Sequence, residues 1–334
     1  MTRLAPQGQV YLHSYLAPFA DILARTDVTD IYVNRPGELW AETLGGEVEH
    51  HPAPTLTRDV LDRLARQIAA LAHQGVSREH PLLSAALPSG ERVQFIIPPA
   101  TRGEPALAIR KHVGSDLRLD DYVAAGAFED LAARSALGAA PDDQARLRAL
   151  LDAGDMAGLL RSAVLGRRNI LISGGTSTGK TTFLNALIAE IPLNERLIFI
   201  EDTPELKFPH CNAVGLLAAR SVLGESGLTA EDLLNASLRM RPDRILLGEL
   251  RGPEAFTFLR SVNTGHPGSM TTVHADSPAR AIEQIALLVL QGGARLSRED
   301  VLHYVRSTID VFVQLDRRGG RRIVSNIQLR GDWL

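Results

Sequence analysis

A glycine-rich segment, GGTSTGKT at 174–181, has the G-x-x-x-x-G-K-T spacing of a phosphate-binding loop, between an apolar run expected to be a strand and one expected to be a helix. Glycines let backbone N–H groups point at phosphate oxygens, and the N-terminus of the following helix favours negative charge. Lys180 is expected to reach the β- and γ-phosphates, and Thr181 to place its hydroxyl on Mg²⁺. The residues expected to bind a nucleotide here are Gly174, Gly175, Thr176, Ser177, Thr178, Gly179, Lys180, Thr181 and Thr182.

Three acidic residues lie at the ends of apolar runs that are expected to be strands. Glu249 lies near the end of 244–250 (RILLGEL), and Glu201 and Asp202 end 197–202 (LIFIED). Ligands gather at the carboxyl ends of parallel strands. A carboxylate there can polarise an attacking water or hold Mg²⁺. We therefore predict that Glu249 and Glu201 are catalytic, with Glu201 also a candidate Mg²⁺ ligand and Asp202 a further candidate. Ordinary surface acids at strand ends are the alternative.

Two histidines, His266 and His274, bracket the segment GHPGSMTTVHA at 265–275. A neutral imidazole can contact a γ-phosphate or a neighbouring acid, so His274 is a candidate catalytic residue and His266 a further candidate. Zinc binding is a competing hypothesis, but neither cysteines nor an HExxH helix accompany these histidines. A hydrogen-bonded structural histidine is the other alternative.

The N-terminal part of the chain predicts a small α+β domain, residues 1–114. The segment 30–42 (DIYVNRPGELWAE) predicts a hairpin around a Pro-Gly turn, and apolar residues at helical spacing predict a helix capped by Thr57. Two strands are expected at 92–97 and 106–111.

An α/β nucleotide-binding domain, residues 166–334, is expected after a long, partly helical linker, residues 115–165. Short apolar strands alternate with helices in this domain, which predicts a mostly parallel sheet covered on both faces. Helix starts are expected at Thr229 with Asp232 and at Ser277 with Pro278. The expected strands are 170–173, 197–202, 245–250, 268–274 and 311–315.

Composition narrows the class of protein. The chain of 334 residues has 36 Lys and Arg against 39 Asp and Glu, a formal net charge of −3, which argues against nucleic-acid binding over its whole surface. A single cysteine, Cys211, excludes an internal disulfide or cysteine zinc site and fits a reducing compartment. Neither a signal peptide nor a run of about 18 apolar residues is present, so we expect a cytoplasmic protein.

Together these segments resemble the secretion traffic ATPases, a superfamily that serves type II and type IV secretion, type IV pili and conjugation. The segments 30–42 and 80–100 resemble the small N-terminal domain of the type IV secretion and conjugation branch. Four motifs occur in the family's order: a Walker A loop at 174–181, an acidic box at 200–206 (IEDTPEL), a Walker B segment at 241–251 (RPDRILLGELR) and a His box at 265–275. Arg241, the first residue of the Walker B segment, is a further candidate site residue.

This resemblance implies a homohexameric ring of RecA-like ATPase domains stacked on a ring of N-terminal domains. The ring would use ATP and Mg²⁺ and dock on the cytoplasmic face of a secretion channel in the inner membrane. Its partners would be channel proteins and coupling ATPases, with no direct nucleic-acid contact. ATP hydrolysis would power pilus assembly or the transfer of DNA or protein.

The resemblance also assigns Arg92 and Arg110, on two expected strands of the N-terminal domain, to the nucleotide phosphates. A planar, always-charged guanidinium suits this role because it can bind phosphate oxygens in two places at once. The alternative is that both arginines form exposed ion pairs, which contribute about 0–1 kcal/mol.

Two other functions stay open at this point. One is a motor of type II secretion or type IV pili, although their assembly ATPases commonly carry a four-cysteine zinc module that this chain cannot build. The other is a RecA-like nucleic-acid translocase, against which the acidic net charge and the lack of strips of aromatic and basic residues weigh.

Overall fold

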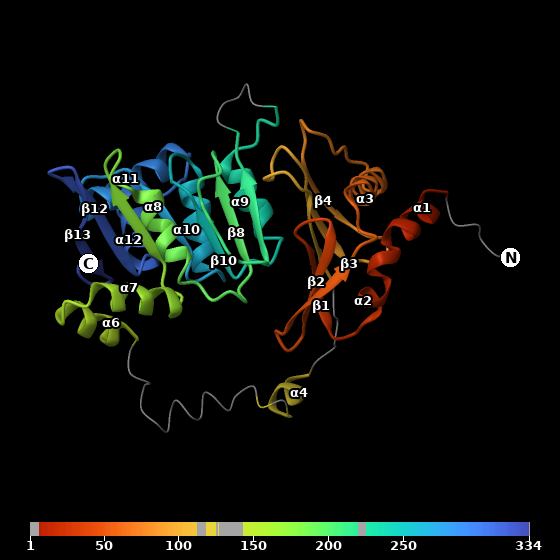
Figure 1. Ribbon diagram of the computed structural model, residues 1–334, viewed down its shortest axis with the longest axis horizontal. Helices are drawn as coiled ribbons and strands as arrows, with labels where there is room; N and C mark the ends of the chain where they lie inside the picture. Colours follow the sequence, from red (N-terminus) through yellow and green to blue (C-terminus); the bar gives the residue numbers. More distant parts are fainter. Residues whose placement is uncertain (1–6, 112–117, 125, 127–142, 220–224, 334) are drawn as a thin grey trace.

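Two β-sheets with their own helices make up the structure, a computed structural model that describes residues 7–111, 118–124, 126, 143–219 and 225–333. We call residues 7–111 the N-terminal domain and residues 143–333 the C-terminal domain. Figure 1 shows the N-terminal domain (red to orange) beside the C-terminal domain (green to blue).

The N-terminal sheet is antiparallel throughout, in the order β3-β2-β1-β6-β5-β4. Its first two strands pair as neighbours across the Pro-Gly turn, which confirms the predicted hairpin. The strands are β1 (Val28–Val33), β2 (Gly37–Thr43), β3 (Val48–Ala53), β4 (Leu82–Ala86), β5 (Arg92–Ile96) and β6 (Ala106–Arg110).

Helices cover one face of this sheet. They are α1 (Gln7–Leu16), α2 (Ala20–Ala24) and α3 (Arg58–Leu71), with a 3₁₀ turn, Ala17–Phe19, between the first two. As predicted, Thr57 caps α3, where its side chain accepts a 3.3 Å hydrogen bond from the Val60 amide. Leu61, Leu64 and Ile68 form its buried stripe.

The C-terminal sheet has the order β13-β12-β7-β11-β10-β8-β9. Only the β12–β13 pair is antiparallel, which confirms a mostly parallel sheet. The predicted strands correspond to five of its members, but β9 and β13, its two edge strands, were not predicted. The strands are β7 (Ile170–Gly174), β8 (Leu197–Glu201), β9 (Ala213–Leu217), β10 (Arg244–Leu247), β11 (Met270–Val273), β12 (Val311–Arg318) and β13 (Arg321–Leu329).

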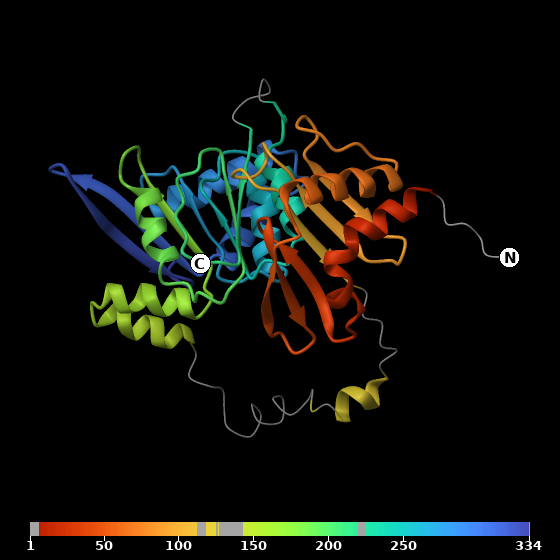
Figure 2. The same ribbon diagram turned by 45° about the vertical axis from the view of Figure 1, so that its right-hand side comes forward.

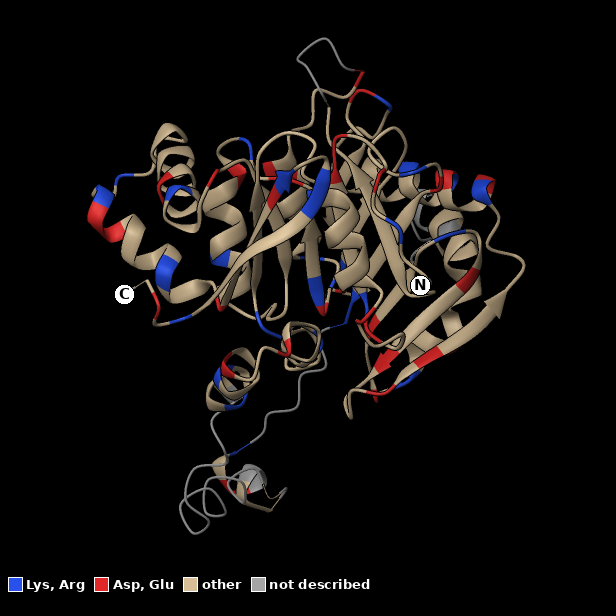
Figure 3. Ribbon diagram, turned by 60° about the vertical axis from the view of Figure 1, so that its left-hand side comes forward, with Lys and Arg blue, Asp and Glu red and all other residues tan. Residues whose placement is uncertain are grey.

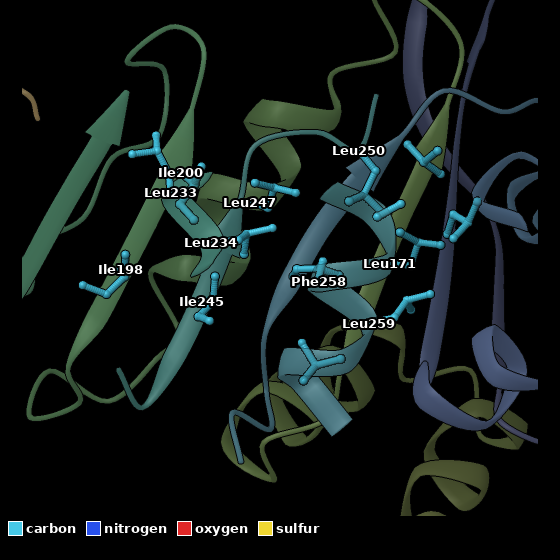
Figure 4. Packing of buried hydrophobic residues seen from close by; sticks show 14 of the residues in the cluster. Leu171, Ile198, Ile200, Leu233, Leu234, Ile245, Leu247, Leu250, Phe258 and Leu259 are labelled. Atoms are coloured by element: carbon cyan, nitrogen blue, oxygen red, sulfur yellow. The ribbon is translucent and has the colours of Figure 1, made fainter. Parts of the chain in front are cut away.

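Both faces of this sheet are buried, because alternate side chains of each strand enter different cores. Ile198 and Ile200 pack in a core with α9, α10, α11 and α12 (Figure 4), whereas Leu197 and Phe199 pack in a core with α6, α7 and α8. The predicted helix starts are confirmed by a capping box of Thr229 with Asp232 and by Ser277 as an N-cap. The helices are α6 (Asp143–Asp152), α7 (Met156–Leu165), α8 (Lys180–Ile188), α9 (Ala230–Ser237), α10 (Glu254–Asn263), α11 (Pro278–Gln291) and α12 (Arg298–Thr308).

The expected linker at 115–165 contains two helices, α6 and α7, that pack on the C-terminal sheet. Leu147 of α6 and Leu159 and Ala163 of α7 share a core with Ile170. A further helix, α4 (Leu119–Ala124), precedes them. The rest of the expected linker, and its boundary with the N-terminal domain, lie outside the described residues, so the domain limits stay a prediction.

The second face of the N-terminal sheet packs on the C-terminal domain. Tyr32, Ile96 and Ala106 belong to the same buried cluster as residues of β8 and α9. Backbone pairing continues across this interface. The Leu217 amide donates to the Ala100 carbonyl at 2.9 Å, and the Arg102 amide donates to Gly215 at 3.1 Å. The N-terminal domain therefore covers β9, the edge strand of the larger sheet.

Among the helices that the structure describes, none is both long and apolar enough to cross a membrane.

Candidate functional site

The glycine-rich loop connects the end of β7 to the start of α8, as the phosphate-loop hypothesis requires. Ser177 and Gly179 have positive φ angles of 64° and 93°, and Gly179 is the N-cap of α8. Gly174 has no room for a side chain, because an added Cβ would lie 2.5 Å from the Thr178 hydroxyl and 2.9 Å from the Leu315 carbonyl. The loop therefore needs its glycines for both conformation and space.

Lys180 is buried at the first position of α8 and contacts the loop itself. Its Nζ donates to the carbonyl oxygens of Gly174 at 3.0 Å and Gly175 at 3.3 Å, and lies 3.3 Å from His274 Nδ1. Burial lowers the pKa of this ammonium from its ordinary value. The amine is thus held directly under the loop, where a bound phosphate would meet it.

A hollow of about 290 Å³ lies over the loop, and we call it the phosphate hollow. It brings together the predicted residues of three motifs, since loop residues 176, 177 and 179–182 share it with Glu249 and His274. These residues follow β7, β10 and β11, which are neighbouring parallel strands, so their carboxyl ends meet at one sheet edge.

Glu249 is held between two neighbouring strands. The Gly248 amide before it donates to Ile200 at 2.9 Å, and the Leu250 amide after it donates to Thr272 at 2.8 Å. One carboxylate oxygen, Oε2, accepts from Arg251 at 2.7 Å. The other, Oε1, lies 2.9 Å from His274 Nε2, but this approach lacks hydrogen-bond geometry, so Oε1 is buried without a hydrogen bond. Glu249 therefore has one acceptor oxygen without a hydrogen bond.

Glu201 has a different environment from Glu249. Its side chain is only 3% exposed, and its Oε2 accepts hydrogen bonds from the amides of Glu205 at 2.9 Å and Leu206 at 2.7 Å. Its Oε1 pairs with the guanidinium of Arg102, which comes from the N-terminal domain. Both oxygens thus have partners within the chain, and its role as a catalytic residue or Mg²⁺ ligand stays a prediction.

Arg102 is a residue that the sequence reasoning missed. Its guanidinium also donates to the Leu206 carbonyl at 2.9 Å and lies 5.1 Å from the centre of the Phe208 ring. Gly215 makes space for it, since an added Cβ there would lie 2.5 Å from Arg102 Cδ. No local signal marks this arginine, because its partner is 99 positions away in the chain.

A prediction about stability follows from the burial of this ion pair. Arg102→Met is expected to lower the free energy of unfolding by about 3 kcal/mol, because it leaves a buried carboxylate without its cation. Adding Glu201→Gln to Arg102→Met is expected to restore part of this loss, since a neutral amide can still accept the two backbone hydrogen bonds. Urea unfolding of the wild type, both single variants and the double variant measures the coupling. If the loss of unfolding free energy in the double variant equalled the sum of the two single losses, this coupling would be contradicted.

The remaining acidic and histidine candidates lie in two places. Asp202 lies 2.5 Å from Arg251, whose guanidinium also binds Glu249, so Arg251 connects the acidic box to the Walker B segment. His266 precedes β11 whereas His274 follows it, which puts the two histidines at opposite ends of that strand. His266 donates from Nδ1 to the Pro242 carbonyl at 2.8 Å, and burial lowers its pKa.

Arg241 also lies away from the phosphate hollow, at the contact between the two domains. Its guanidinium binds Glu42 of the N-terminal sheet at 2.8 Å and lies 3.8 Å from Asp243. Nearby, fully buried Arg196 donates to Asn34 and Asn212 and stacks over the ring of Tyr32, 3.9 Å from its centre. These contacts give Arg241 a part in holding the domains together.

Arg92 and Arg110 lie side by side but not at the phosphate hollow of their own chain. They are directly opposite each other on β5 and β6 and share a hollow of about 420 Å³ with Arg239. Arg110 also binds Asp30 at 2.8 Å. The lining of this hollow contains no residue of the glycine-rich loop. The two arginines are therefore brought together, but away from the loop.

The loop suits Mg²⁺ held jointly with a nucleotide. Thr181 borders both the phosphate hollow and the neighbouring hollow that contains Glu201, Asp202 and Glu249. Within the ranges described above, no group of three or more His, Cys, Asp or Glu side chains could hold a metal ion on its own. Magnesium in such sites takes only one or two protein ligands, and phosphate oxygens and water complete the set. The Thr181 hydroxyl fits this arrangement.

A mostly parallel sheet with a glycine-rich loop between its β7 strand and the next helix defines a P-loop nucleotide-binding fold. A protein-family model described as "Type II/IV secretion system protein" matches residues 147–317 of this chain. The chain belongs to that family.

Relatives cover almost the whole chain. The type IV secretion system protein VirB11 of Bartonella quintana is 38% identical over 327 residues, which cover 93% of this chain and 91% of that protein. The type IV secretion system protein PtlH of Bordetella pertussis is 39% identical over 336 residues, which cover 97% of each. The chain is thus a homologue of VirB11 and PtlH over nearly its full length.

A solved structure shows the same arrangement. The crystal structure of the VirB11 ATPase from the Brucella suis type IV secretion system, in complex with sulphate, has a TM-score of 0.89 and 37% sequence identity. The match covers 97% of this chain and 95% of that one. The fold expected from the sequence, a small N-terminal α+β domain before a P-loop domain, is confirmed.

Proposed function

We propose that this protein hydrolyses ATP with Mg²⁺ and is the motor of a type IV secretion or conjugation system. The observation that carries the proposal is the shared position of Lys180, Glu249 and His274 over one glycine-rich loop. The similarity to VirB11 and PtlH supports the secretion role.

Each residue would have a separate task in hydrolysis. The amides of the loop and the N-terminus of α8 bind the phosphates, and Lys180 neutralises the β- and γ-phosphate oxygens. Thr181 would hold Mg²⁺, which supplies further charge neutralisation when it is bound. Glu249 Oε1 accepts a hydrogen bond from the attacking water and orients it, while His274 lies beside that oxygen.

The site would be completed by a second copy of the chain. The hollow that Arg92 and Arg110 share contains no residue of their own glycine-rich loop, and neither arginine lines the phosphate hollow, yet arginine is well suited to phosphate. In a ring built from head-to-tail contacts, the arginines of one copy can meet the loop of its neighbour. A homohexamer is the ring that the family resemblance implies.

The location and partners follow from the secretion role. We propose that the ring is cytoplasmic, on the inner face of the inner membrane, where it contacts channel proteins and coupling ATPases. ATP-driven movement of its domains would assemble the pilus or transfer DNA or protein.

A nucleic-acid translocase is the competing candidate. Figure 3 shows basic and acidic residues interspersed along the ribbons of both domains. A channel for single-stranded nucleic acid needs a continuous basic groove. Stimulation of ATP hydrolysis by single-stranded DNA, but not by secretion-channel proteins, would favour the translocase.

The basic test of the proposal is hydrolysis itself. The purified chain is expected to release phosphate from ATP in the presence of Mg²⁺ and to lose this activity when EDTA removes the metal, because the phosphate charge is then unneutralised. Phosphate release is measured before EDTA, after EDTA and after excess Mg²⁺ is added back. Activity that persists in EDTA would contradict the assigned metal dependence.

A further inference from the structure

A segment of the N-terminal domain, between β5 and β6, lies along the edge strand of the C-terminal sheet. Thr101 forms an antiparallel bridge with Leu216 of β9. The backbone hydrogen bonds of Ala100 and Arg102 to the same strand lie on either side of this bridge. Figure 1 and Figure 2 both show this part of the N-terminal domain (orange) meeting the C-terminal domain. The backbone of Arg102 is therefore fixed on the edge of the sheet that carries the site.

The side chain of Arg102 crosses β9 and reaches the end of β8. It passes over Gly215, where an added Cβ would lie 2.5 Å from Arg102 Cδ. Its guanidinium then has two partners in the C-terminal domain, the Glu201 carboxylate and the Leu206 carbonyl. These two partners begin and end the segment 201–206, which is most of the acidic box. One guanidinium of the N-terminal domain thus binds both ends of this segment.

Glu201 closes the same segment from within. Its Oε2 accepts hydrogen bonds from the amides of Glu205 and Leu206, so the chain between them folds back onto the end of β8. A buried carboxylate without a cation is unfavourable, and Arg102 supplies the cation that pairs with its other oxygen. The path of the acidic box therefore depends on Arg102.

The acidic box also contacts the elements that form the phosphate hollow. Glu205 lines this hollow, and its carbonyl accepts a 3.1 Å hydrogen bond from Asn185 of α8. Asp202 lies 2.5 Å from Arg251, which in turn lies 2.7 Å from Glu249 Oε2. A displacement of the acidic box would move Arg251, and with it the Glu249 carboxylate.

We propose that Arg102 is a positioning residue for ATP hydrolysis, which holds the acidic box in place and so orients Glu249 through Asp202 and Arg251. This inference rests on the proposed ATPase function. The N-terminal domain then acts on the site of its own chain through Arg102, whereas the two arginines of β5 and β6 would act on a neighbouring copy. The site of each chain is fully formed only when its own N-terminal domain is docked on β9.

The expected effect is on turnover and not on ATP binding. Arg102 lines neither the phosphate hollow nor the neighbouring hollow that contains Glu201, so its removal leaves the glycine-rich loop unchanged. The orientation of Glu249 matters when water attacks, which affects the transition state alone. Misplacement of a catalytic group by about 1 Å can reduce the rate by about 10²-fold.

The first test is Arg102→Met, with Arg78→Met as its control. Arg78 pairs with Glu225 of the C-terminal domain, so the control also breaks an ion pair between the domains, but neither residue lines a hollow beside the loop. At saturating ATP, turnover is expected to fall about 10-fold to 100-fold in Arg102→Met, while the dissociation constant for ATP stays within about twofold of the wild type. The control is expected to keep both values.

Thermal unfolding first sets a temperature at which all of these variants are folded, because Arg102→Met is also expected to be less stable. Equal turnover in Arg102→Met and Arg78→Met at that temperature would overturn the proposal. A loss confined to ATP binding would overturn it as well.

Gly215→Ala is a second variant, which displaces the arginine without removing its charge. The added Cβ would lie 2.5 Å from Arg102 Cδ and 2.7 Å from its Nε, so the side chain must shift. Turnover is expected to fall about threefold or more. In the Arg102→Met background the same substitution is expected to have no further effect on turnover, because the alanine acts through the arginine. An equal fall in both backgrounds would contradict this.

Hydrogen exchange tests the position of the acidic box without nucleotide. The amides of Glu205 and Leu206 are expected to exchange about tenfold faster or more in Arg102→Met than in the wild type, because the carboxylate that accepts from them has lost its cation. Mass spectrometry of peptides that cover residues 201–207 measures this, with peptides of β10 as the internal control. Unchanged exchange would overturn the proposal. A wild-type chain without ATPase activity would contradict the proposed function, and exchange would still decide whether Arg102 holds the acidic box.

Discussion

Glu249→Gln is expected to bind ATP as the wild type does and to hydrolyse it roughly 10²–10⁴-fold more slowly. The reason is the buried Oε1, which has no hydrogen bond and lies beside His274; both residues line the phosphate hollow. A carboxylate there accepts a hydrogen bond from water and increases its nucleophilicity. The amide of glutamine has nearly the same shape but is a much weaker base. Binding contacts are therefore kept, and the contribution to the transition state is lost.

Two measurements separate the effect of the substitution on ATP binding from its effect on hydrolysis. ATP affinity is measured by equilibrium binding, and turnover by phosphate release under conditions that saturate the site. Glu283→Gln is the control for the substitution itself, because Glu283 lies on α11 and pairs with Arg298 outside the phosphate hollow. Wild-type turnover in Glu249→Gln would remove Glu249 from its role. Loss of ATP binding would show that Glu249 acts in binding instead.

The parts of the fold that depend on local pattern could be predicted from the sequence. The hairpin at the Pro-Gly turn, the Thr57 cap and the capping box of Thr229 with Asp232 all rest on residues a few positions apart. The edge strand β13 was not predicted because most of its residues are polar and it is held in the sheet by pairing with β12. Its sequence lacks the alternation of apolar and polar residues that would predict a strand.

The docking of the two domains could not be predicted from local pattern. β6 is buried at four successive positions, which looks like an interior strand of a parallel sheet. The structure shows another cause, since Leu107 and Ile109 face the N-terminal core while Ala106 and Ala108 face the C-terminal domain. Both faces of an antiparallel sheet are covered here because a second domain lies against it.

The residues of the candidate site also fall into two groups, those that could be predicted from the sequence and those that could not. The loop, Glu249 and His274 were predicted together because each lies at the end of a strand, and parallel strands end at one edge. Arg102, which pairs with Glu201, and Arg322 of β13, which lines the phosphate hollow, were missed because each comes from an element distant in sequence. Arg92 and Arg110 were predicted as a pair, and the register of β5 with β6 does place them opposite each other. In the ring proposed above, they would act on the loop of a neighbouring copy.

The proposal that arginines act on the loop of a neighbouring copy predicts that two inactive variants restore each other. Lys180→Ala loses the cation under the phosphates, and Arg92→Ala loses the arginine that would come from the neighbour. Each alone is expected to reduce ATP turnover by about 10³-fold. Arg92 is chosen because removing Arg110 would leave the buried carboxylate of Asp30 without its cation.

Mixed rings distinguish an arginine that acts on the loop of a neighbouring copy from one that acts on the loop of its own chain. In a Lys180→Ala and Arg92→Ala mixture at equal amounts, about one quarter of the head-to-tail contacts would join an intact loop to an intact arginine. Turnover of the mixture is therefore expected to rise well above that of either variant alone, because complete sites form between copies. The subunits must exchange, so they are denatured and refolded together, and phosphate release is compared with that of each variant refolded alone. If Arg92 acted on the loop of its own chain, every subunit of the mixture would still lack one group, and no activity would return.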